Sequence, residues 1–268
     1  MNNNSIGVFD SGLGGLTAVK SIMELLPGEN IVYFGDTGRL PYGTKTEETI
    51  KQYAAGDIRF LLSHNVKLIV IACGTASSVA LSDMRNKFTT PIVGVVEAAC
   101  EAAVKLTKNK KVGVLGTSAT IKSESYLRGI SEIDSGIKVY QKACPLFVPL
   151  VENGHFNTEV TRLVVKEYLE PIKNEGVDTL ILGCTHYPLL EKAIAEYMGE
   201  EVRIVNVGAE LAKSIGNILG KDNISDKTEG GICEYYVSDD EKGFAELGGV
   251  FLERKINGQV KKIDIEKY

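Results

Sequence analysis

Two cysteines stand at similar turns in the two halves of the sequence. Cys73 ends a short apolar run and is followed by Gly-Thr, and Cys184 ends another and is followed by Thr. A thiol at a strand-to-helix turn meets the first N–H groups and the positive dipole end of the helix, which lower its pKa from about 8.5. We therefore predict that this pair does chemistry, whereas Cys100, Cys144 and Cys233 are interpreted as buried core thiols.

Two opposed thiols with a small ligand between them form a two-base device. One takes a proton from carbon as a thiolate and the other returns a proton to the opposite face, which inverts a stereocentre. A thiol can reach the pKa near the operating pH that general acid–base catalysis requires. A carbanion formed beside a carboxylate also needs hydrogen-bond donors, and turn N–H groups and hydroxyls are suitable. The candidate hydroxyls are those of Ser11, Thr75, Thr117 and Thr185.

Charged side chains near these turns are candidates for assisting proton transfer. His186 lies two residues after Cys184 and could exchange protons with the thiol or a substrate nitrogen, or simply cap a turn. Asp10 and Asp36 each end an apolar run, where a carboxylate could bind an ammonium group, orient a thiol or cap a helix. Glu152 lies in a polar break after another apolar run. No metal site is predicted, because the cysteines lack further ligands at suitable spacing.

Short apolar runs alternate with amphipathic stretches, which is typical of βαβ units in a parallel sheet. The runs that predict strands are residues 6–9, 31–34, 68–72, 92–96, 112–115, 180–182 and 202–205. The stretches that predict helices are residues 15–26, 46–64, 76–88, 97–107, 156–174, 187–198 and 208–219. Thr-Lys-Thr-Glu at 44–47 is interpreted as a capping box that opens the second helix. Nearly every strand ends in a polar or glycine-rich turn, and ligands bind beyond the carboxyl ends of parallel strands.

A weak internal repeat relates the two halves of the chain. Residues 6–12 pair loosely with residues 112–118, and residues 68–75 pair with residues 179–185. Each half thus offers a hydroxyl-bearing turn followed, at a similar distance, by a cysteine that ends a buried strand. If the two halves face each other, the cysteines lie on opposite walls of one crevice. A length of 268 residues is enough for two α/β domains.

A competing motif follows the first predicted strand. Gly-Leu-Gly-Gly-Leu-Thr at 12–17, with Asp36 closing the second strand, comes close to a dinucleotide-binding fingerprint. Thr17 stands where the third glycine belongs, and a glycine-rich helix N-terminus binds a substrate carboxylate as well as a pyrophosphate. A dinucleotide-dependent oxidoreductase or a nucleotide-binding module therefore stays open as an alternative.

The composition argues against several classes of partner. Thirty Lys plus Arg against 35 Asp plus Glu give a formal charge of −5, and no basic run with aromatics could follow a nucleic-acid backbone. No apolar stretch approaches the roughly 18 residues of a membrane span, and the N-terminus lacks a signal-peptide pattern. The five cysteines form no C-x-x-C pair. We expect a cytoplasmic protein with free thiols, no nucleic-acid partner and no membrane contact.

Several motifs, in order along the chain, resemble those of the glutamate racemase family in the aspartate/glutamate racemase superfamily. They are Asp-Ser-Gly-x-Gly-Gly at 10–15, Gly-Asp at 35–36 followed by Leu-Pro-Tyr-Gly at 40–43, Ala-Cys-x-Thr-Ala at 72–76, and Leu-Gly-Cys-Thr-His-Tyr-Pro-Leu at 182–189. The resemblance implies a cofactor-independent interconversion of L- and D-glutamate that supplies D-glutamate for peptidoglycan.

The resemblance also implies an architecture. The fold would be α/β, with two similar doubly wound domains of mainly parallel sheets, related by pseudo-twofold symmetry, and the active site would lie in the cleft between them. One domain would comprise residues 1–97 plus 207–268 and the other residues 98–206. The protein would form a homodimer.

Roles carry over from the family residue by residue. Cys73 would act on D-glutamate and Cys184 on L-glutamate. Proton transfer would be assisted by Asp10, Glu152 and His186. The substrate would be held by Asp10, Ser11, Pro41, Tyr42, Gly43, Gly74, Thr75, Thr117, Thr120, Thr185 and His186.

One position departs from the family pattern. Gly74 stands where the family usually has Asn, whose side chain contacts the substrate. Loss of that contact removes hydrogen bonding of about 1 to 3 kcal/mol if nothing replaces it. The departure leaves open a racemase of a related acid, of the aspartate or hydantoin type.

Overall fold

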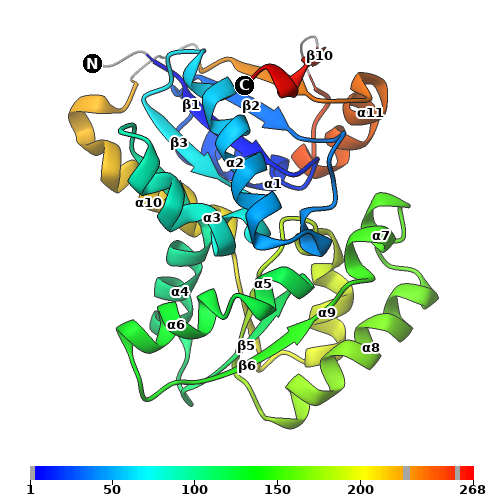
Figure 1. Ribbon diagram of the computed structural model, residues 1–268. Helices are drawn as coiled ribbons and strands as arrows, with labels where there is room; N and C mark the ends of the chain where they lie inside the picture. Colours follow the sequence, from blue (N-terminus) through cyan, green and yellow to red (C-terminus); the bar gives the residue numbers. More distant parts are fainter. Residues whose placement is uncertain (1–3, 226–229, 257–259) are drawn as a thin grey trace.

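The computed structural model describes residues 4–225, 230–256 and 260–268. In this part of the chain the strands form two sheets with parallel neighbours throughout. The first, in the order β10-β9-β2-β1-β3-β4, comprises β1 (Ile6–Asp10), β2 (Ile31–Gly35), β3 (Leu68–Ile71), β4 (Ile92–Gly94), β9 (Cys233–Val237) and β10 (Val260–Lys262). The second, in the order β6-β5-β7-β8, comprises β5 (Lys111–Gly116), β6 (Lys138–Ala143), β7 (Thr179–Leu182) and β8 (Arg203–Val205). We call the halves built on these sheets the first lobe and the second lobe, which lie above and below in Figure 1.

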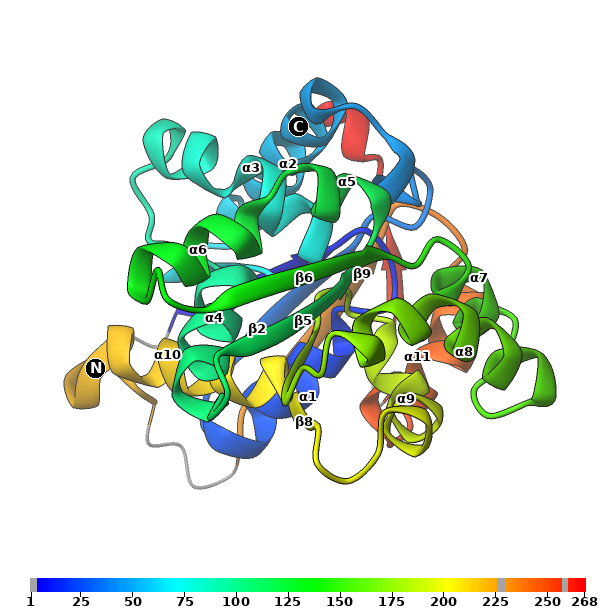
Figure 2. The ribbon, with the colours of Figure 1, turned by 90° about the horizontal axis from the view of Figure 1, so that it is seen from below.

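Helices cover both faces of each sheet (Figures 1 and 2). On the first sheet, one face carries α1 (Leu16–Leu25), α10 (Val207–Asn223) and α11 (Glu241–Leu252), and the other carries α2 (Glu47–Leu62) and α3 (Gly74–Lys87). On the second sheet, one face carries α4 (Val95–Leu106) and α6 (Ser125–Ile133), and the other carries α7 (Phe147–Glu152), α8 (Glu159–Asn174) and α9 (Glu191–Met198). The remaining pieces are α5 (Ser118–Lys122) and the 3-10 turns η1 (Tyr42–Thr44), η2 (Tyr187–Leu190) and η3 (Ile265–Lys267). This arrangement confirms the predicted α/β class with two doubly wound parallel sheets.

The central strands read as continuous apolar runs because both of their faces are covered. Every residue of β1, β2, β3 and β7 is buried, so none of them shows the alternation of a half-exposed strand. Among the helices of the described residues, none combines the length and the apolar character that a membrane span requires.

The strand order bears out the internal repeat. The first sheet contains the order β2-β1-β3-β4 and the second has β6-β5-β7-β8, so β1 corresponds to β5 and β3 to β7. These are the pairings that the sequence comparison predicted. Cys73 therefore follows β3 at the position where Cys184 follows β7.

The chain enters the second lobe through α4 and leaves it through α10. Helix α4 packs on the second sheet, where Val96 and Cys100 join the core formed by β5 and α6. Helix α10 packs against α1 through Leu211 and Ile215. The last strands then complete the first sheet, since β9 pairs with β2 in the register Tyr33 to Tyr235.

Several predicted boundaries and one predicted cap differ from the structure. The predicted strand 92–96 ends at Gly94, because helix α4 begins directly after it. The capping-box interpretation is wrong, since the N-cap of α2 is Thr46, whose hydroxyl accepts a hydrogen bond from the backbone N–H of Thr49 at 3.3 Å. The predicted helix 187–198 begins as the 3-10 turn η2 and becomes α-helical only in α9.

Several elements of the described chain were not predicted, namely β6, β9, β10, α5, α6, α7 and α11. Strand β6 has the sequence Lys-Val-Tyr-Gln-Lys-Ala and lies at the edge of its sheet, with side chains that are half-buried or exposed. An edge strand of this kind contains no apolar run, so the hydrophobic pattern does not reveal it.

We expect Leu180→Ala to lower the free energy of unfolding by about 2 to 5 kcal/mol, because it leaves a cavity in a fully buried strand. The matched control is Leu163→Ala on α8, where the side chain is 61% exposed and the expected change is within about 0.5 kcal/mol. Urea unfolding followed by circular dichroism measures both variants. Equal losses in the two variants would contradict the assignment of β7 to the core.

Candidate active site

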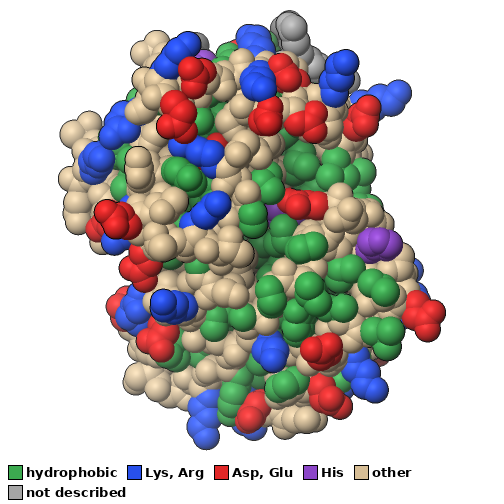
Figure 3. All heavy atoms as spheres, turned by 45° about the vertical axis from the view of Figure 1, so that its right-hand side comes forward, with side chains coloured by type: hydrophobic (Ala, Val, Ile, Leu, Met, Phe, Trp, Pro, Cys, Tyr) green, Lys and Arg blue, Asp and Glu red, His purple; other side chains and the backbone are tan. Residues whose placement is uncertain are grey.

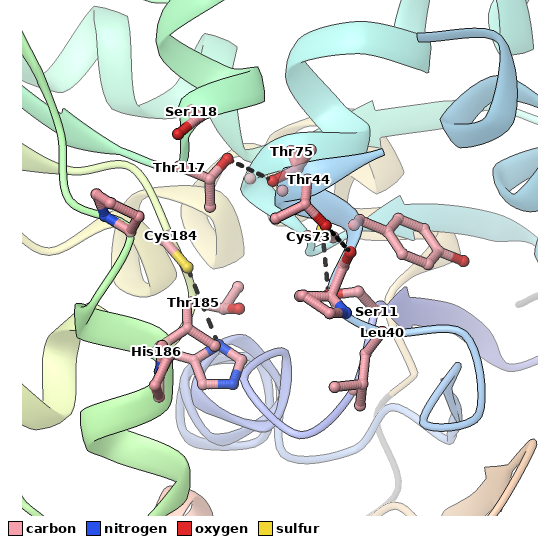
Figure 4. A pocket seen from close by; sticks show the side chains of 18 of the residues that line it. Ser11, Leu40, Thr44, Cys73, Thr75, Thr117, Ser118, Cys184, Thr185 and His186 are labelled. Atoms are coloured by element: carbon pink, nitrogen blue, oxygen red, sulfur yellow. Dashed lines mark hydrogen bonds between the residues drawn. The ribbon is translucent and has the colours of Figure 1, made fainter. Parts of the chain in front are cut away.

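Cys73 and Cys184 reach the same cavity from different lobes. Cys73 follows β3 and is the N-cap of α3, while Cys184 lies in the turn between β7 and η2. Both side chains line a cavity of about 320 Å³ between the lobes. Figure 4 shows the two cysteines on opposite sides of this cavity. The structure therefore brings together the pair that the sequence analysis singled out.

Most of the other predicted site residues also line the cavity. They are Ser11, Pro41, Tyr42, Gly43, Gly74, Thr75, Thr117, Glu152, Thr185 and His186. Asp10 and Thr120 are not among the lining residues and are fully buried one layer behind it.

The two residues behind the lining hold hydroxyls that face the cavity. Asp10 accepts hydrogen bonds from the backbone N–H of Gly12 at 2.9 Å and from the hydroxyl of Thr185 at 3.2 Å. The hydroxyl of Thr120 lies 3.0 Å from that of Thr117, which in turn lies 2.9 Å from that of Thr75. Because Thr75 belongs to the first lobe and Thr117 to the second, this contact joins the two lobes directly.

The structure adds lining residues that the sequence reasoning missed. They are Gly12, Leu40, Thr44, Ser118, Cys144, Pro145, Val148 and Pro149. Cys144 is a buried core thiol, as predicted, and it also lies in the cavity wall. The position of Cys144 directly after strand β6 could have indicated this, because the other site turns also follow strands, but β6 was not predicted.

Hydrophobic side chains gather along the junction of the lobes on the face shown in Figure 3.

The expected lowering of the thiol pKa is wrong for Cys73. Burial, and then the charge of Asp10, raise the pKa of the Cys73 thiol to about 12. The backbone N–H of Ala76, 3.5 Å from Sγ, and the contact of Sγ with the Ser11 hydroxyl at 3.6 Å act in the opposite direction. Desolvation outweighs the helix N-terminus here, so Cys73 is a protonated thiol at rest.

His186 lies between Cys184 and Glu152. Its Nδ1 is 3.9 Å from Sγ of Cys184, and its Nε2 is 3.3 Å from a carboxylate oxygen of Glu152. The latter contact has the distance of an ion pair but not the geometry of a hydrogen bond. Burial lowers the pKa of His186, but Cys184, Glu152 and the charge of Asp10 together outweigh it and raise the pKa to about 10. An imidazolium beside Cys184 stabilises negative charge on that sulfur.

Asp36 has none of the three roles that its position in the sequence suggests. It does not line the cavity, and it is not the N-cap of a described helix. Its carboxylate instead accepts hydrogen bonds from Arg39 Nε at 2.7 Å and from the Ser238 hydroxyl at 2.9 Å.

Close packing accounts for the glycines of the fingerprint-like turn. A Cβ on Gly14 would lie 2.2 Å from the Thr185 hydroxyl oxygen, and a Cβ on Gly15 would lie 2.5 Å from Cβ of Asp10. The first of these contacts is made across the two lobes. The glycines therefore allow the lobes and the turn to approach, and they need no dinucleotide to explain them.

Gly74 packs closely against the turn that carries Cys184. A Cβ at this position would lie 2.2 Å from the backbone carbonyl oxygen of Gly183, which directly precedes Cys184. No side chain fits there at the present separation of the lobes. The glycine that replaces the usual Asn therefore has a packing role in this chain.

Comparison with known proteins agrees with this geometry. The family model described as Asp/Glu/Hydantoin racemase matches residues 7–215. This protein belongs to that family. A glutamate racemase of Geobacter metallireducens is 44% identical over 263 residues, covering 98% of this chain and 97% of the relative.

Solved structures of family members superpose over nearly the whole chain. A glutamate racemase of Bacillus anthracis has a TM-score of 0.94 at 36% identity and covers 98% of each chain. The glutamate racemase of Francisella tularensis, solved in complex with D-glutamate, has a TM-score of 0.92 at 35% identity and covers 100% of each chain. The racemase fold is thus shared from end to end.

We expect Gly74→Ala to lower kcat/KM for racemisation about 10- to 100-fold, because the new Cβ must push the cysteine turns apart by a fraction of an ångström or more. The control is Gly56→Ala within α2, where a Cβ meets no atom within 4 Å and activity should be unchanged. Polarimetry of both variants measures the effect. A Gly74→Ala enzyme with wild-type kcat/KM would show that the lobes tolerate a wider gap.

We expect His186 to be an imidazolium at neutral pH. Its folded pKa of about 10 exceeds the ordinary 6.5, so its contribution to stability is complete below pH 6.5 and is lost as the pH rises toward 10. Nitrogen-15 NMR of the imidazole ring reports its charge directly, and Glu152→Gln should lower the midpoint. In His186→Gln the unfolding free energy should vary less across the same pH window. A neutral ring at pH 7 in the wild-type protein would contradict this assignment.

Proposed function

We propose that this protein is a cofactor-independent glutamate racemase that uses Cys73 and Cys184 as its two acid–base groups. The observation that carries the proposal is the arrival of these thiols, each at the end of a corresponding strand of a different lobe, in one cavity. Relatives with 44% identity over almost the full length are named glutamate racemases, which supports glutamate as the substrate.

The reaction needs two proton transfers on opposite faces of the α-carbon. With D-glutamate bound and the Cys73 proton released to solvent, Cys73 as thiolate takes the α-proton, and the electron pair of the C–H bond stays on carbon beside the carboxylate. Cys184 as thiol then gives its proton to the opposite face, which yields L-glutamate and leaves a thiolate at Cys184. The reverse reaction starts from that state. Proton exchange with solvent resets the pair between turnovers.

The neighbours of each thiol differ, and so do their proposed roles. His186, with Glu152 behind it, would stabilise the Cys184 thiolate through its positive charge. Asp10 would act from behind the other wall, where it holds the Thr185 hydroxyl and disfavours a resting thiolate at Cys73. The substrate α-ammonium, once bound between the thiols, favours the thiolate electrostatically.

Apart from the His186 ring, neutral donors would hold the two substrate carboxylates. The residues that line the described cavity include no Lys or Arg, so the proposed donors are hydroxyls and the first N–H groups of α3. The candidate hydroxyls are Ser11, Thr75, Thr117, Ser118 and Thr185. The apolar side chains opposite them exclude water and so strengthen these hydrogen bonds.

The two alternative functions were suggested by sequence features that close packing now explains. The proposal of an aspartate or hydantoin racemase depended on Gly74, and the contact of Gly74 with Gly183 supplies a packing reason for this glycine. The proposal of a dinucleotide-dependent enzyme depended on the turn at 12–17, where the glycines serve close packing.

Further parts of the proposal concern organisation and context. We take residues 1–97 plus 207–268 and residues 98–206 as the two domains, which the membership of the strands in the two sheets supports. We also propose that the protein is a homodimer and that its D-glutamate supplies peptidoglycan synthesis. The five free cysteines fit a reducing compartment, and we propose the cytoplasm.

The decisive experiment follows deuterium incorporation at the α-carbon in heavy water, with each enantiomer of glutamate and no added cofactor. The wild-type protein should exchange and invert both enantiomers. Cys73→Ser and Cys184→Ser should each lower racemisation at least about 100-fold, because each removes one acid–base group. Residual exchange, where it persists, should be confined to one enantiomer in each variant.

The matched control is Cys233→Ser, whose thiol lies outside the cavity on β9 and should leave turnover unchanged. Wild-type turnover in both active-site variants would refute the two-thiol mechanism. Turnover of aspartate in preference to glutamate would refute the substrate assignment.

A further inference from the structure

A cluster of buried charged side chains lies outside the reacting pair, behind the segment 40–44 that lines the cavity. It joins Asp36 after β2, Arg39 and Tyr42 in the following loop, and Asp57 on α2. The two carboxyl groups are 0% exposed and Tyr42 is 1% exposed. Nothing in the proposed chemistry uses Asp57.

The phenol of Tyr42 has one proton to share between two carboxyl groups. Its oxygen is in hydrogen-bond contact with Asp36 Oδ2 and lies 2.9 Å from Asp57 Oδ2. Burial, together with the nearby carboxyl groups, raises the pKa of Tyr42 well above its ordinary value, so the phenol keeps its proton. It can donate that proton to only one acceptor. The other carboxyl group must therefore carry a proton and donate it to the phenol oxygen.

The surrounding donors identify which carboxyl group is ionised. Asp36 accepts from Arg39 Nε through Oδ2 and from the Ser238 hydroxyl through Oδ1, so both of its oxygens already face donors. Asp57 accepts from Arg39 Nη2 at 2.8 Å through Oδ1, and its Oδ2 faces only the phenol. Burial, and then the charge of Asp36, raise the pKa of Asp57 well above its ordinary value. The proton belongs on Asp57 Oδ2.

We propose that Asp57 is a neutral carboxylic acid that positions the substrate-facing segment 40–44, by donating to Tyr42 and accepting from Arg39. The chain of hydrogen bonds runs from Asp57 through the phenol to the Asp36 carboxylate, whose charge Arg39 balances. Asp57 is thus a positioning residue, and its effect on activity rests on the proposed racemase function. The charged and titratable groups that face it are Asp36, Arg39, Tyr42 and, at longer range, Asp10.

The segment matters because it touches both the cavity and the second lobe. Its members Leu40, Pro41, Tyr42, Gly43 and Thr44 all line the cavity. A Cβ on Gly43 would lie 2.7 Å from Cβ of Thr117, so the segment packs directly on the opposite lobe. The phenol of Tyr42 and the guanidinium of Arg39, which also lies 4.2 Å above the Tyr53 ring, fix it from behind.

The test compares the same substitution at the two carboxyl groups. In Asp57→Asn, the amide N–H replaces the acid as donor to Tyr42 and the amide oxygen still accepts from Arg39. We therefore expect kcat/KM within about 2-fold of wild type and an unchanged Tm. Asp36→Asn removes the negative charge that balances Arg39, and only a neutral amide is left to face Arg39 Nε and the Tyr42 phenol. We expect about a 10-fold loss of kcat/KM, mostly through KM, and a lower Tm.

Two further variants complete the comparison. Asp57→Ala should raise KM about 10-fold, since Tyr42 and Arg39 each lose a partner, and Asp57→Asn should restore it. The control Asp83→Asn changes a surface carboxylate, 48% exposed, that pairs with Lys51, and should leave all values unchanged.

Infrared spectroscopy tests the proton without reference to activity. The wild-type protein should show the carbonyl band of a buried protonated carboxyl group, and Asp57→Asn should lack it. Equal losses in Asp57→Asn and Asp36→Asn, or the absence of that band difference, would overturn the proposal. A wild-type protein without racemase activity would refute the proposed function, and the infrared difference would still decide the protonation of Asp57.

Discussion

The separation of the two cysteine turns is the constraint on which the site depends. A two-base reaction at one carbon requires both sulfurs to reach it, yet the sulfurs belong to sheets that share no strand. Besides the contact between the Thr75 and Thr117 hydroxyls, the lobes approach each other closely at three glycines of the first lobe, Gly14, Gly43 and Gly74. Each faces the second lobe closely enough that a Cβ would collide with it. Glycine is needed at these positions because it lets the two lobes come close together, and its conformational freedom is secondary.

The close approach of the two lobes also affects the electrostatics of the site. Because the lobes exclude water, burial dominates the titration of Cys73 and opposes the effect of the helix N-terminus. Beside Cys184 lies the His186 ring, whose raised pKa makes it an imidazolium, with Glu152 on its far side. The two thiols are therefore similar in their place in the fold but unlike in their surroundings. That asymmetry suits a pair in which one member is a thiolate while the other is a thiol.

Sequence periodicity was sufficient for the central strands and for the positions of the two cysteines, because buried parallel strands are continuous apolar runs. Sequence periodicity did not predict the edge strands β6 and β10. Strand β6 mixes charged, polar and apolar residues without an apolar run, so the turn after it, which includes Cys144, was not predicted to line the site. The pKa of Cys73 depends on how much water the opposite lobe removes, and a turn motif carries no information about that. The packing role of Gly74 depends on Gly183, more than 100 positions away.

The return of the chain to the first sheet has a consequence for synthesis on the ribosome. The second sheet uses only strands between Lys111 and Val205, so all of its strands have emerged before the chain is complete. Strand β2 must wait for β9, which begins at Cys233, before its outer edge is paired. The first sheet is therefore completed after all strands of the second sheet have been made, and until β9 arrives the unpaired edge of β2 can pair with another chain.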